Sequence, residues 1–295
     1  MSSLHPSRKP LAIAALLFGA AAIAFAPILV RLSDTSPAAS AFWRMALAAP
    51  ILWVWVLLSE RASERNLPLA KHRQWKLLAL AGLFFAADLG SWHWSIVFTS
   101  VANATLELNL APIFVTIGAW LLFRQRASKL FLVALLVTLA GAALLIGPNI
   151  GGAGKVLLGD ALGILAGLFY ACYMLAIKSA SSNVSTARIM AVSTTVAACV
   201  LAPYAFFTAE QFIPQSAHGW LILFGMALVV HVLGQSLIAY GFAHLPASFS
   251  SVSLLMQPVM AALYAWVILG ERMGPNQIAG GAIVLLGIYL AKRGS

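Results

Sequence analysis

Long apolar runs separated by short polar connections fill the whole chain. Crossing the hydrocarbon core of a bilayer takes a helix of about 20 mostly apolar residues. Ten runs approach or reach that length, and the connections between them are too short to hold a soluble domain. The pattern predicts an all-α integral membrane protein with ten transmembrane helices, at 11–32, 38–58, 76–98, 102–122, 129–147, 158–178, 188–208, 218–241, 248–268 and 276–291.

The composition agrees with this prediction. The chain has 62% hydrophobic and 9% charged residues, whereas soluble domains have about 25% charged residues. The first run follows Arg8 and Lys9, as in a signal peptide, but it is longer than the apolar region of such a peptide, so we expect a membrane helix. Cys172 and Cys199 lie inside apolar runs, so we predict neither a disulfide framework nor a metal site.

The net charge of +10 is spread between the apolar runs instead of forming a patch, so we expect contact with anionic lipid and no nucleic-acid partner. With the N-terminus in the cytoplasm, 14 of the 18 basic residues fall on the cytoplasmic side. The four on the other side are Arg31, Arg44, Lys155 and Arg272. By the positive-inside rule, this predicts a multi-pass protein of a bacterial-type inner (plasma) membrane with both termini cytoplasmic.

The two halves of the chain are related. A shift of 146 residues places Leu108, Pro112, Trp120, Arg126 and Gly141 on Leu254, Pro258, Trp266, Arg272 and Gly287. Each half has five predicted spans, an odd number, so the second half enters the membrane from the opposite side. We therefore predict two inverted five-helix repeats, 1–147 and 148–295. Such repeats occur in secondary transporters, which bind their substrates near the midplane between the repeats.

Several stretches carry a family resemblance: Leu254–Pro258, Trp266–Arg272, Gln277–Gly287, Asn109–Pro112 and Phe42–Arg44. They resemble the corresponding helices of EamA-type transporters of the drug/metabolite transporter superfamily. The resemblance covers nearly the whole chain and implies export of amino acids or other metabolites, the YddG-like amino-acid exporters being one kind. One position departs from the family pattern, because Glu271 of the second half is matched by Gln125 in the first, so the resemblance does not imply a symmetric role for this Glu.

Charged side chains at mid-bilayer cost roughly 2.5–3.5 kcal/mol on insertion scales, so each needs a reason. Asp88 shares a helical face with Trp92, which indicates either a cavity wall that binds an amine or a proton, or a structural ion pair. Glu107 lies one turn after Asn103, and it indicates either a cation or coupling-proton site or a pair with Arg44.

The second half offers amides and a histidine. Gln257, one turn after Ser253, directly precedes Pro258, and His231 shares a face with Gln235. His231 is either a proton relay or a packing residue. Trp94 and Tyr173 lie deeper than an interfacial belt, so they are candidates to stack on a substrate. The predicted substrate-binding residues are Asp88, Trp92, Trp94, Asn103, Glu107, Tyr173, His231, Gln235, Ser253 and Gln257, with Pro112 and Pro258 as gating kinks.

We expect a secondary transporter that exports small amphipathic metabolites, amino acids foremost, by alternating access, with drug or other metabolite efflux as the alternative. A membrane-embedded enzyme is less consistent with the sequence, which has no HExxH or GxSxG motif. We expect no cofactor. The central spans carry Asp88 and Glu107 but no Lys, which favours zwitterionic or cationic substrates. Ten spans can enclose a cavity, so we expect a functional monomer.

Overall fold

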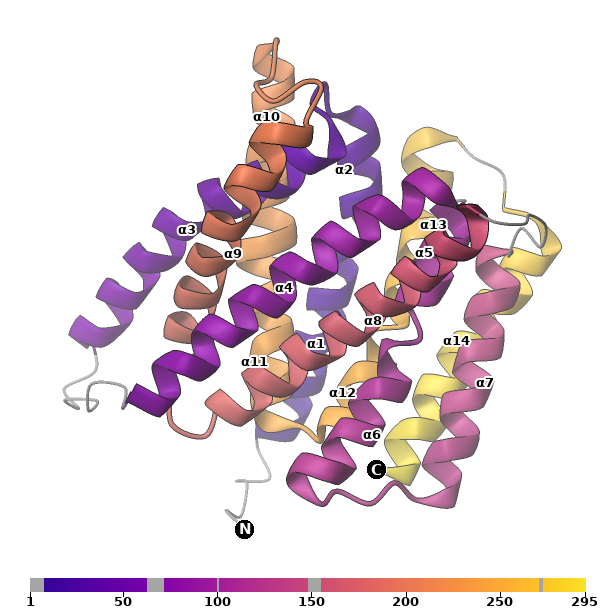
Figure 1. Ribbon diagram of the computed structural model, residues 1–295. Helices are drawn as coiled ribbons and strands as arrows, with labels where there is room; N and C mark the ends of the chain where they lie inside the picture. The colour runs from indigo at the N-terminus through magenta and orange to yellow at the C-terminus, as the bar shows by residue number, and fades with distance from the viewer. Residues whose placement is uncertain (1–7, 63–71, 100, 148–154, 271–272) are drawn as a thin grey trace.

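The computed structural model describes residues 8–62, 72–99, 101–147, 155–270 and 273–295, and within these ranges every regular element is a helix (Figure 1). The all-α prediction is therefore confirmed for the described part of the chain. Glu271 and Arg272, which entered the sequence comparison above, lie outside the described residues.

The first half contains α1 (Arg8–Ile23), α2 (Ala26–Leu32), α3 (Pro37–Ala62), α4 (His72–Phe98), α5 (Val101–Leu108), α6 (Ala111–Phe123) and α7 (Lys129–Ile146). The second half contains α8 (Lys155–Ala180), α9 (Thr186–Thr208), α10 (Ala217–Gly225), the π-helix η1 (Met226–Gln235), α11 (Ser236–His244), α12 (Ala247–Ser253), α13 (Met256–Leu269) and α14 (Pro275–Gly294).

Nine helical stretches of the described residues are long and apolar enough to cross a membrane, and they match the first nine predicted spans. The tenth predicted span, 276–291, lies in α14, which has 20 residues. Its polar ends, at Asn276–Gln277 and Lys292–Arg293, leave a shorter apolar centre than the other spans have.

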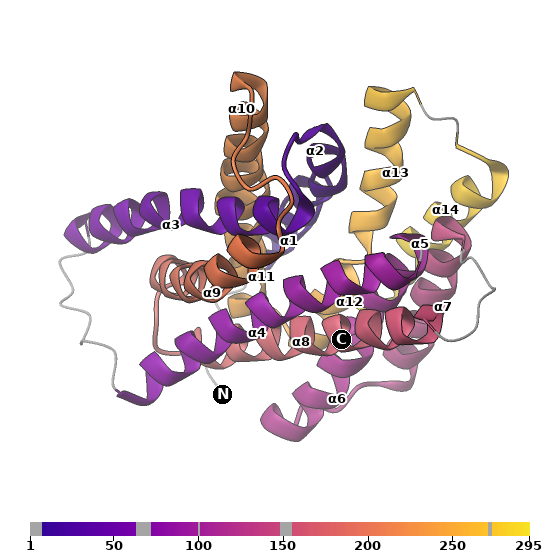
Figure 2. The ribbon, with the colours of Figure 1, turned by 45° about the horizontal axis from the view of Figure 1, so that its top comes forward.

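The contacts between helices follow a pattern that exchanges the two halves. α1 packs on η1 and α11, and α8 packs on α4, which is the equivalent pair after exchange. Equivalent helices also pack on each other, α3 on α9 and α7 on α14, and the contact of α4 with α9 corresponds to that of η1 with α3. Figure 2 shows α7 and α14 side by side at one edge of the bundle, with α3 and α9 toward the other. This is the packing expected of two inverted repeats.

Small residues allow the close contact between α7 and α14. A Cβ atom on Gly280 would lie 2.5 Å from the backbone nitrogen of Leu145, and one on Gly287 would overlap the side chain of Thr138. Lipid supplies no hydrophobic force to hold helices together, so membrane helices depend on close packing, and glycines at such crossings let the backbones approach closely.

Three of the membrane spans are interrupted, between α1 and α2, between α5 and α6, and between α12 and α13. The second interruption lies at Asn109–Leu110 and the third at Leu254–Leu255, and Pro112 and Pro258 lie in the first turns of α6 and α13. The backbone stays in the right-handed helical region at Leu110 and Leu255, so each span is kinked just before its proline, which removes one helix hydrogen bond and crowds the preceding turn.

The prediction of one unbroken helix at 11–32 is wrong in detail. The span divides at Ala24–Phe25, and Pro27 lies in the first turn of α2. The span at 217–244 is continuous but contains the ten-residue π-helix η1 between α10 and α11. π-Helical turns are rare and are often found at functional sites.

Candidate functional site

A cavity of ≈ 220 Å³ lies among the broken helices, and residues next to each of the three breaks line it. Ala24 lies at the first break, Asn109 at the second, and Leu254 with Leu255 at the third. Because a break frees the helix backbone from its regular pairing, membrane proteins place such segments where they line a cavity.

The cavity is closed toward the end of the bundle where α1 begins and α14 ends, the lower end in Figure 1. There α12 packs on α6, and all seven residues of α12 are buried. At the opposite end the lining includes Pro37, an exposed residue at the start of α3. The upper halves of the broken helices, α5 and α13, flank the cavity between these two ends.

Two opposite charges lie in the cavity wall. Arg44 of α3 and Asp88 of α4 both line the cavity, and their charges interact with each other. The carboxylate of Asp88 is almost fully buried, with 4% of the residue exposed. The Arg44 guanidinium carbon lies 5.7 Å from the centroid of the Phe85 ring, within the range of a cation–π interaction. The wall therefore offers a cation and an anion from neighbouring helices.

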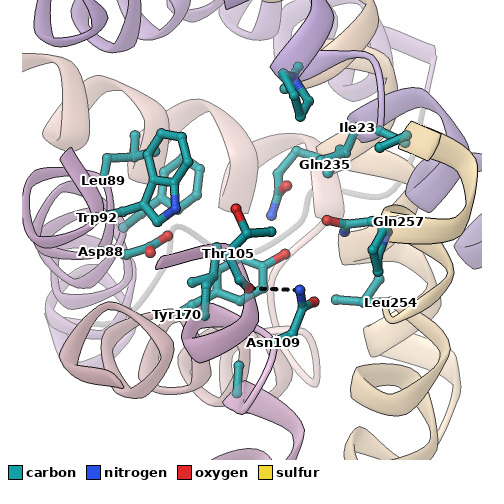
Figure 3. A pocket seen from close by; sticks show the side chains of 18 of the residues that line it. Ile23, Asp88, Leu89, Trp92, Thr105, Asn109, Tyr170, Gln235, Leu254 and Gln257 are labelled. Atoms are coloured by element: carbon teal, nitrogen blue, oxygen red, sulfur yellow. Dashed lines mark hydrogen bonds between the residues drawn. The ribbon is translucent and has the colours of Figure 1, made fainter. Parts of the chain in front are cut away.

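Polar side chains from the second half face this charged pair. Figure 3 shows Gln235 and Gln257 on one side of the cavity and Asp88 with Trp92 on the other. Tyr170 of α8 also lines the cavity beside these two amides.

Between these two sides, the side-chain nitrogen of Asn109 donates to the carbonyl oxygen of Thr105 at 2.8 Å, the dashed line in Figure 3. This bond fixes the end of α5 at the point where the helix is interrupted.

Three lining residues carry buried N–H donors that have no hydrogen-bond partner within the described part of the chain. They are Nε of Arg44, Nε1 of Trp92 and Nε2 of Gln257. Buried polar atoms are nearly always paired in folded proteins, so unpaired donors around one cavity indicate that something else pairs with them. Water or a bound group that carries hydrogen-bond acceptors would satisfy them.

Half of the residues predicted from the sequence line this cavity. These are Asp88, Trp92, Gln235 and Gln257, together with Pro112 and Pro258. Trp94 does not line it. It is 44% exposed on the outer surface of the bundle and stacks on Phe98, with ring centroids 5.8 Å apart. A shift of two residues turns a side chain about halfway around a helix, which separates Trp92 from Trp94.

Tyr173 and His231 are buried one layer behind the cavity wall. The Tyr173 hydroxyl accepts from Nε2 of Gln235 at 3.2 Å, and its ring stacks on Phe85 with centroids 4.6 Å apart. Nε2 of His231 lies 2.7 Å from Oγ1 of Thr194. These side chains support residues of the wall without lining it.

Ser253 is also buried away from the cavity, in α12, where its hydroxyl donates to the carbonyl oxygen of Phe249 at 2.9 Å.

Asn103 and Glu107 face α8 instead of the cavity. The Asn103 amide donates to Oγ1 of Thr99 at 3.3 Å, and the Glu107 carboxyl lies against Gly163 of α8. The structure therefore does not contain a Glu107–Arg44 pair, because the acid beside Arg44 is Asp88. The physical reason is the rotation of α5, which turns Thr105 and Asn109 toward the cavity and Glu107 toward α8.

The sequence reasoning did not select several residues of the wall as binding residues. Arg44 could have been found, since an arginine inside a predicted span needs a reason as much as Asp88 does. Asn109 could have been found from its place just before Pro112. Nothing in the sequence separates Tyr170 from an interfacial aromatic. Among the described residues, no group of three or more His, Cys, Asp or Glu side chains could hold a metal ion.

Comparisons with known proteins agree with this architecture. The model of the EamA-like transporter family matches residues 10–147 and again residues 157–293. A transporter from Archaeoglobus fulgidus is 29% identical over 217 residues, covering 74% of this chain and 76% of the relative. The pseudopaline exporter CntI from Pseudomonas aeruginosa is 26% identical over 263 residues, covering 88% of each chain.

A riboflavin transporter from Vibrio cholerae is 26% identical over 219 residues, covering 72% of this chain and 70% of the relative. A solved crystal structure has the same fold, with a TM-score of 0.81 at 16% identity over 97% of both chains. The family matches both halves of the helical bundle, as the predicted repeat architecture requires. The chain therefore belongs to the EamA-like transporter family and is a multi-pass membrane transporter.

Proposed function

We propose that this protein exports small zwitterionic metabolites, amino acids foremost, through the cavity between its two repeats. The observation that carries the proposal is the pair of opposite charges, Arg44 and Asp88, in the wall of one cavity. A guanidinium binds a carboxylate through charge-assisted hydrogen bonds, and a carboxylate binds an ammonium group in the same way. An α-amino acid carries both groups within a few ångströms of each other.

The unpaired donors support the carboxylate half of this assignment. Nε1 of Trp92 and Nε2 of Gln257 supply donors besides Arg44, and a carboxylate has the acceptor sites to satisfy them. Asp88 then receives the amine. Apolar residues such as Leu89, Leu254 and Ala261 line the rest of the wall and suit an uncharged side chain.

Alternating access gives the direction of transport. The excess of basic residues at the end of the bundle that holds the termini supports a cytoplasmic location for that end in an inner membrane. The described conformation is then open to the outside, with α6 and α12 closing the cytoplasmic side. Exchange of the repeat conformations would close α5 toward α13 and separate α12 from α6. Because one chain encloses the cavity, we propose that the monomer is the functional unit.

Export of other metabolites or drugs is the second candidate. The relatives named above are an exporter of pseudopaline and a transporter of riboflavin, so the family is not restricted to one class of substrate. The mostly apolar lining of the cavity favours this candidate for compounds that lack the zwitterionic head group.

Counterflow in proteoliposomes tests the proposal. Vesicles are loaded in turn with a neutral amino acid, its amide, the matching carboxylic acid without the amine, and a non-amino-acid metabolite. We expect the intact amino acid to drive uptake of its labelled form, and each analogue lacking one charge to fall about ten-fold or more in apparent affinity, since loss of one buried ionic contact costs at least 1.4 kcal/mol.

Variants assign the two charges. Arg44→Gln should abolish the preference for the free carboxylate, and Asp88→Asn the preference for the free amine. Glu210→Gln and Lys155→Gln remove exposed charges away from the cavity and serve as matched controls that retain counterflow. Equal counterflow with the amino acid and both analogues would exclude zwitterion recognition, and counterflow with only the non-amino-acid metabolite would favour the second candidate.

A further inference from the structure

Cationic side chains gather at one corner of the lower end of the bundle. They belong to the end of α6, the connection to α7, the start of α7 and the end of α14, and they are Arg124, Arg126, Lys129, Lys292 and Arg293. The two stretches lie side by side because the Ser128 hydroxyl donates to the carbonyl oxygen of Gly294 at 2.5 Å. In Figure 1 this corner lies where the C-terminus meets the connection between α6 and α7.

The backbone of this corner is held by close contacts. A Cβ atom on Gly294 would lie 2.6 Å from the backbone nitrogen of Phe131, so the end of α14 touches the backbone of α7 directly. Ser128 also caps α7, since its Oγ accepts from the same nitrogen at 3.1 Å. The fold therefore fixes the positions from which the cationic side chains extend.

The cations of the corner are not neutralised by nearby acids. The stretches 120–132 and 285–295 contain no Asp or Glu. All the cationic side chains of the corner are exposed, and their charged groups make one hydrogen bond, ion pair or ring contact within the described ranges. That contact places the Arg293 guanidinium carbon 4.9 Å from the centroid of the Tyr289 ring.

Lys178 near the end of α8 differs from these cations, because its ammonium donates to the carbonyl oxygens of Ala243 and Leu245 at 3.4 and 2.8 Å. Like charges that lie together repel one another, so an anion from outside the chain is needed to balance the corner.

Arg124 occupies a backbone conformation that favours glycine. Its φ is 54°, and it is the one non-glycine residue with a positive φ among the described residues. The repeat shift of 146 places it on Gly270, which ends α13 with a φ of 69°. Both residues end a helix in the left-handed conformation, which a side chain disfavours and glycine does not. An arginine at a position where glycine serves the fold indicates that its side chain has a role at the surface.

The cations also lie where the lipid-facing surface of the bundle ends. Leu121 and Leu122 of α6 are exposed just before Arg124, and Leu130 of α7 is exposed just after Lys129. In a membrane, acyl chains cover such apolar side chains, and basic residues next to the end of a membrane helix meet anionic lipid head groups. The position of the corner therefore favours a lipid phosphate over a soluble anion.

We propose that the corner formed by α6, α7 and α14 binds the phosphate group of an anionic phospholipid. The guanidinium groups of Arg124, Arg126 and Arg293 donate charge-assisted hydrogen bonds to phosphate oxygens, and the ammonium groups of Lys129 and Lys292 add positive charge. The acyl chains lie against the exposed leucines of α6 and α7. The bound lipid joins the end of α14 to the end of α6, the helix that packs on α12 below the cavity.

Thermal unfolding of the full chain in micelles of an uncharged detergent tests the proposal. The protein is titrated with phosphatidylglycerol or with phosphatidylcholine of the same acyl chains. We expect phosphatidylglycerol to raise the melting temperature, since a ligand that binds only the folded state stabilises it, and phosphatidylcholine to raise it much less. The phosphatidylglycerol concentration that gives half of the shift measures the apparent affinity.

Two double variants of equal charge decide whether the corner is the site. Arg124→Gln with Arg293→Gln should raise the half-effect concentration about 25-fold, because about 1 kcal/mol for each basic residue corresponds to about five-fold in affinity. Lys9→Gln with Lys76→Gln removes two exposed cations elsewhere at the lower end of the bundle and should change it less than about two-fold. An unchanged affinity in the first pair, or an equal loss in both pairs, would overturn the proposal.

Arg124→Gly separates lipid binding from folding. Glycine keeps the left-handed helix end, as Gly270 does in the second half, so the melting temperature without lipid should not fall. The half-effect concentration of phosphatidylglycerol should still rise about five-fold. A lower melting temperature without lipid, together with an unchanged half-effect concentration, would show a structural role for Arg124 and contradict the proposal.

Two further outcomes would also overturn the assignment. Equal shifts with the two lipids would mean that the acyl chains alone stabilise the protein. Sodium phosphate, replacing sodium chloride at equal ionic strength, should not raise the melting temperature; a shift as large as that of phosphatidylglycerol, lost in the Arg124→Gln and Arg293→Gln pair, would assign the corner to a soluble anion. Because no transported substrate is present, these outcomes are separate from those of the counterflow test.

Discussion

Oγ1 of Thr194 in α9 and Nε2 of His231 in η1 lie 2.7 Å apart in the buried contact between these helices. Both side chains are almost inaccessible, with 1% and 0% exposed. In helical segments a histidine can bond its Nδ1 to the carbonyl four residues earlier, as His93 does with Leu89. His231 has no such bond at Nδ1. Its position therefore depends on Thr194.

We predict that Thr194→Val destabilises the protein by about 1–3 kcal/mol, because the substitution keeps the shape but leaves a buried histidine nitrogen unpaired. A lower melting temperature in detergent would be the measured effect. Thr208→Val, at an exposed helix end, is the matched control and should stay within about 0.5 kcal/mol of the parent. An unchanged melting temperature for Thr194→Val would mean that packing alone positions His231.

Replacing either of two glycines of α4 by alanine should change the stability of the protein, in opposite directions. A Cβ on Gly82 would lie 2.6 Å from the carbonyl oxygen of Ser193, whereas one on Gly90 would meet nothing within 4 Å. We predict that Gly82→Ala destabilises the protein by about 1–3 kcal/mol through overpacking against backbone. Gly90→Ala should be stabilising by about 0.5–1 kcal/mol through its better helix propensity. Melting temperatures of the two variants, compared with the parent, check the signs.

Two tryptophans two residues apart should differ in their effect on transport. Trp92 lines the cavity, and its indole N–H has no hydrogen-bond partner in the described ranges, whereas Trp94 lies on the outer surface. We predict that Trp92→Ala weakens the apparent affinity in counterflow about ten-fold or more, which corresponds to about 1.4 kcal/mol. Trp94→Ala should change it less than about two-fold. A larger loss in Trp94→Ala would indicate that the surface aromatic acts on the substrate path.

Asp34, in the loop between α2 and α3, binds the loop between α9 and α10 at the upper end of the bundle. Its Oδ2 accepts from the backbone nitrogens of Gln215 and Ser216, at 3.2 and 3.1 Å, and from the Ser216 hydroxyl at 2.9 Å. We predict that Asp34→Ala speeds amide hydrogen exchange at 215–219 about ten-fold, since this segment then opens more easily. Amides within α9 should exchange as in the parent, and a uniform increase over the chain would instead indicate global destabilisation.

The architecture was predictable because membrane spans and repeats produce patterns along the sequence itself. Apolar run length gave the spans, and the matched Pro112 and Pro258 marked the two related broken helices. A helix break without such a matched proline was missed at Ala24–Phe25, although Pro27 follows it directly.

The candidate site was predictable only in part. Spacing shows which residues share a helix face, so Asp88 and Trp92 were correctly placed together. It does not show which neighbouring helix that face meets, and for this reason Glu107 was predicted as a substrate-binding residue although α5 turns it toward α8. The rotation of each helix is fixed by tertiary packing, here by the glycines of α8 against α5.

The buried segment α12 closes the lower end of the cavity by shape alone. The hydroxyls of Ser251 and Ser253 donate to the carbonyl oxygens of Ser248 and Phe249, within α12 itself. These bonds lie within the segment, so parting α12 from α6 leaves them intact. A seal of this kind parts without breaking these internal hydrogen bonds, which suits a closure that must open and re-form in every transport cycle.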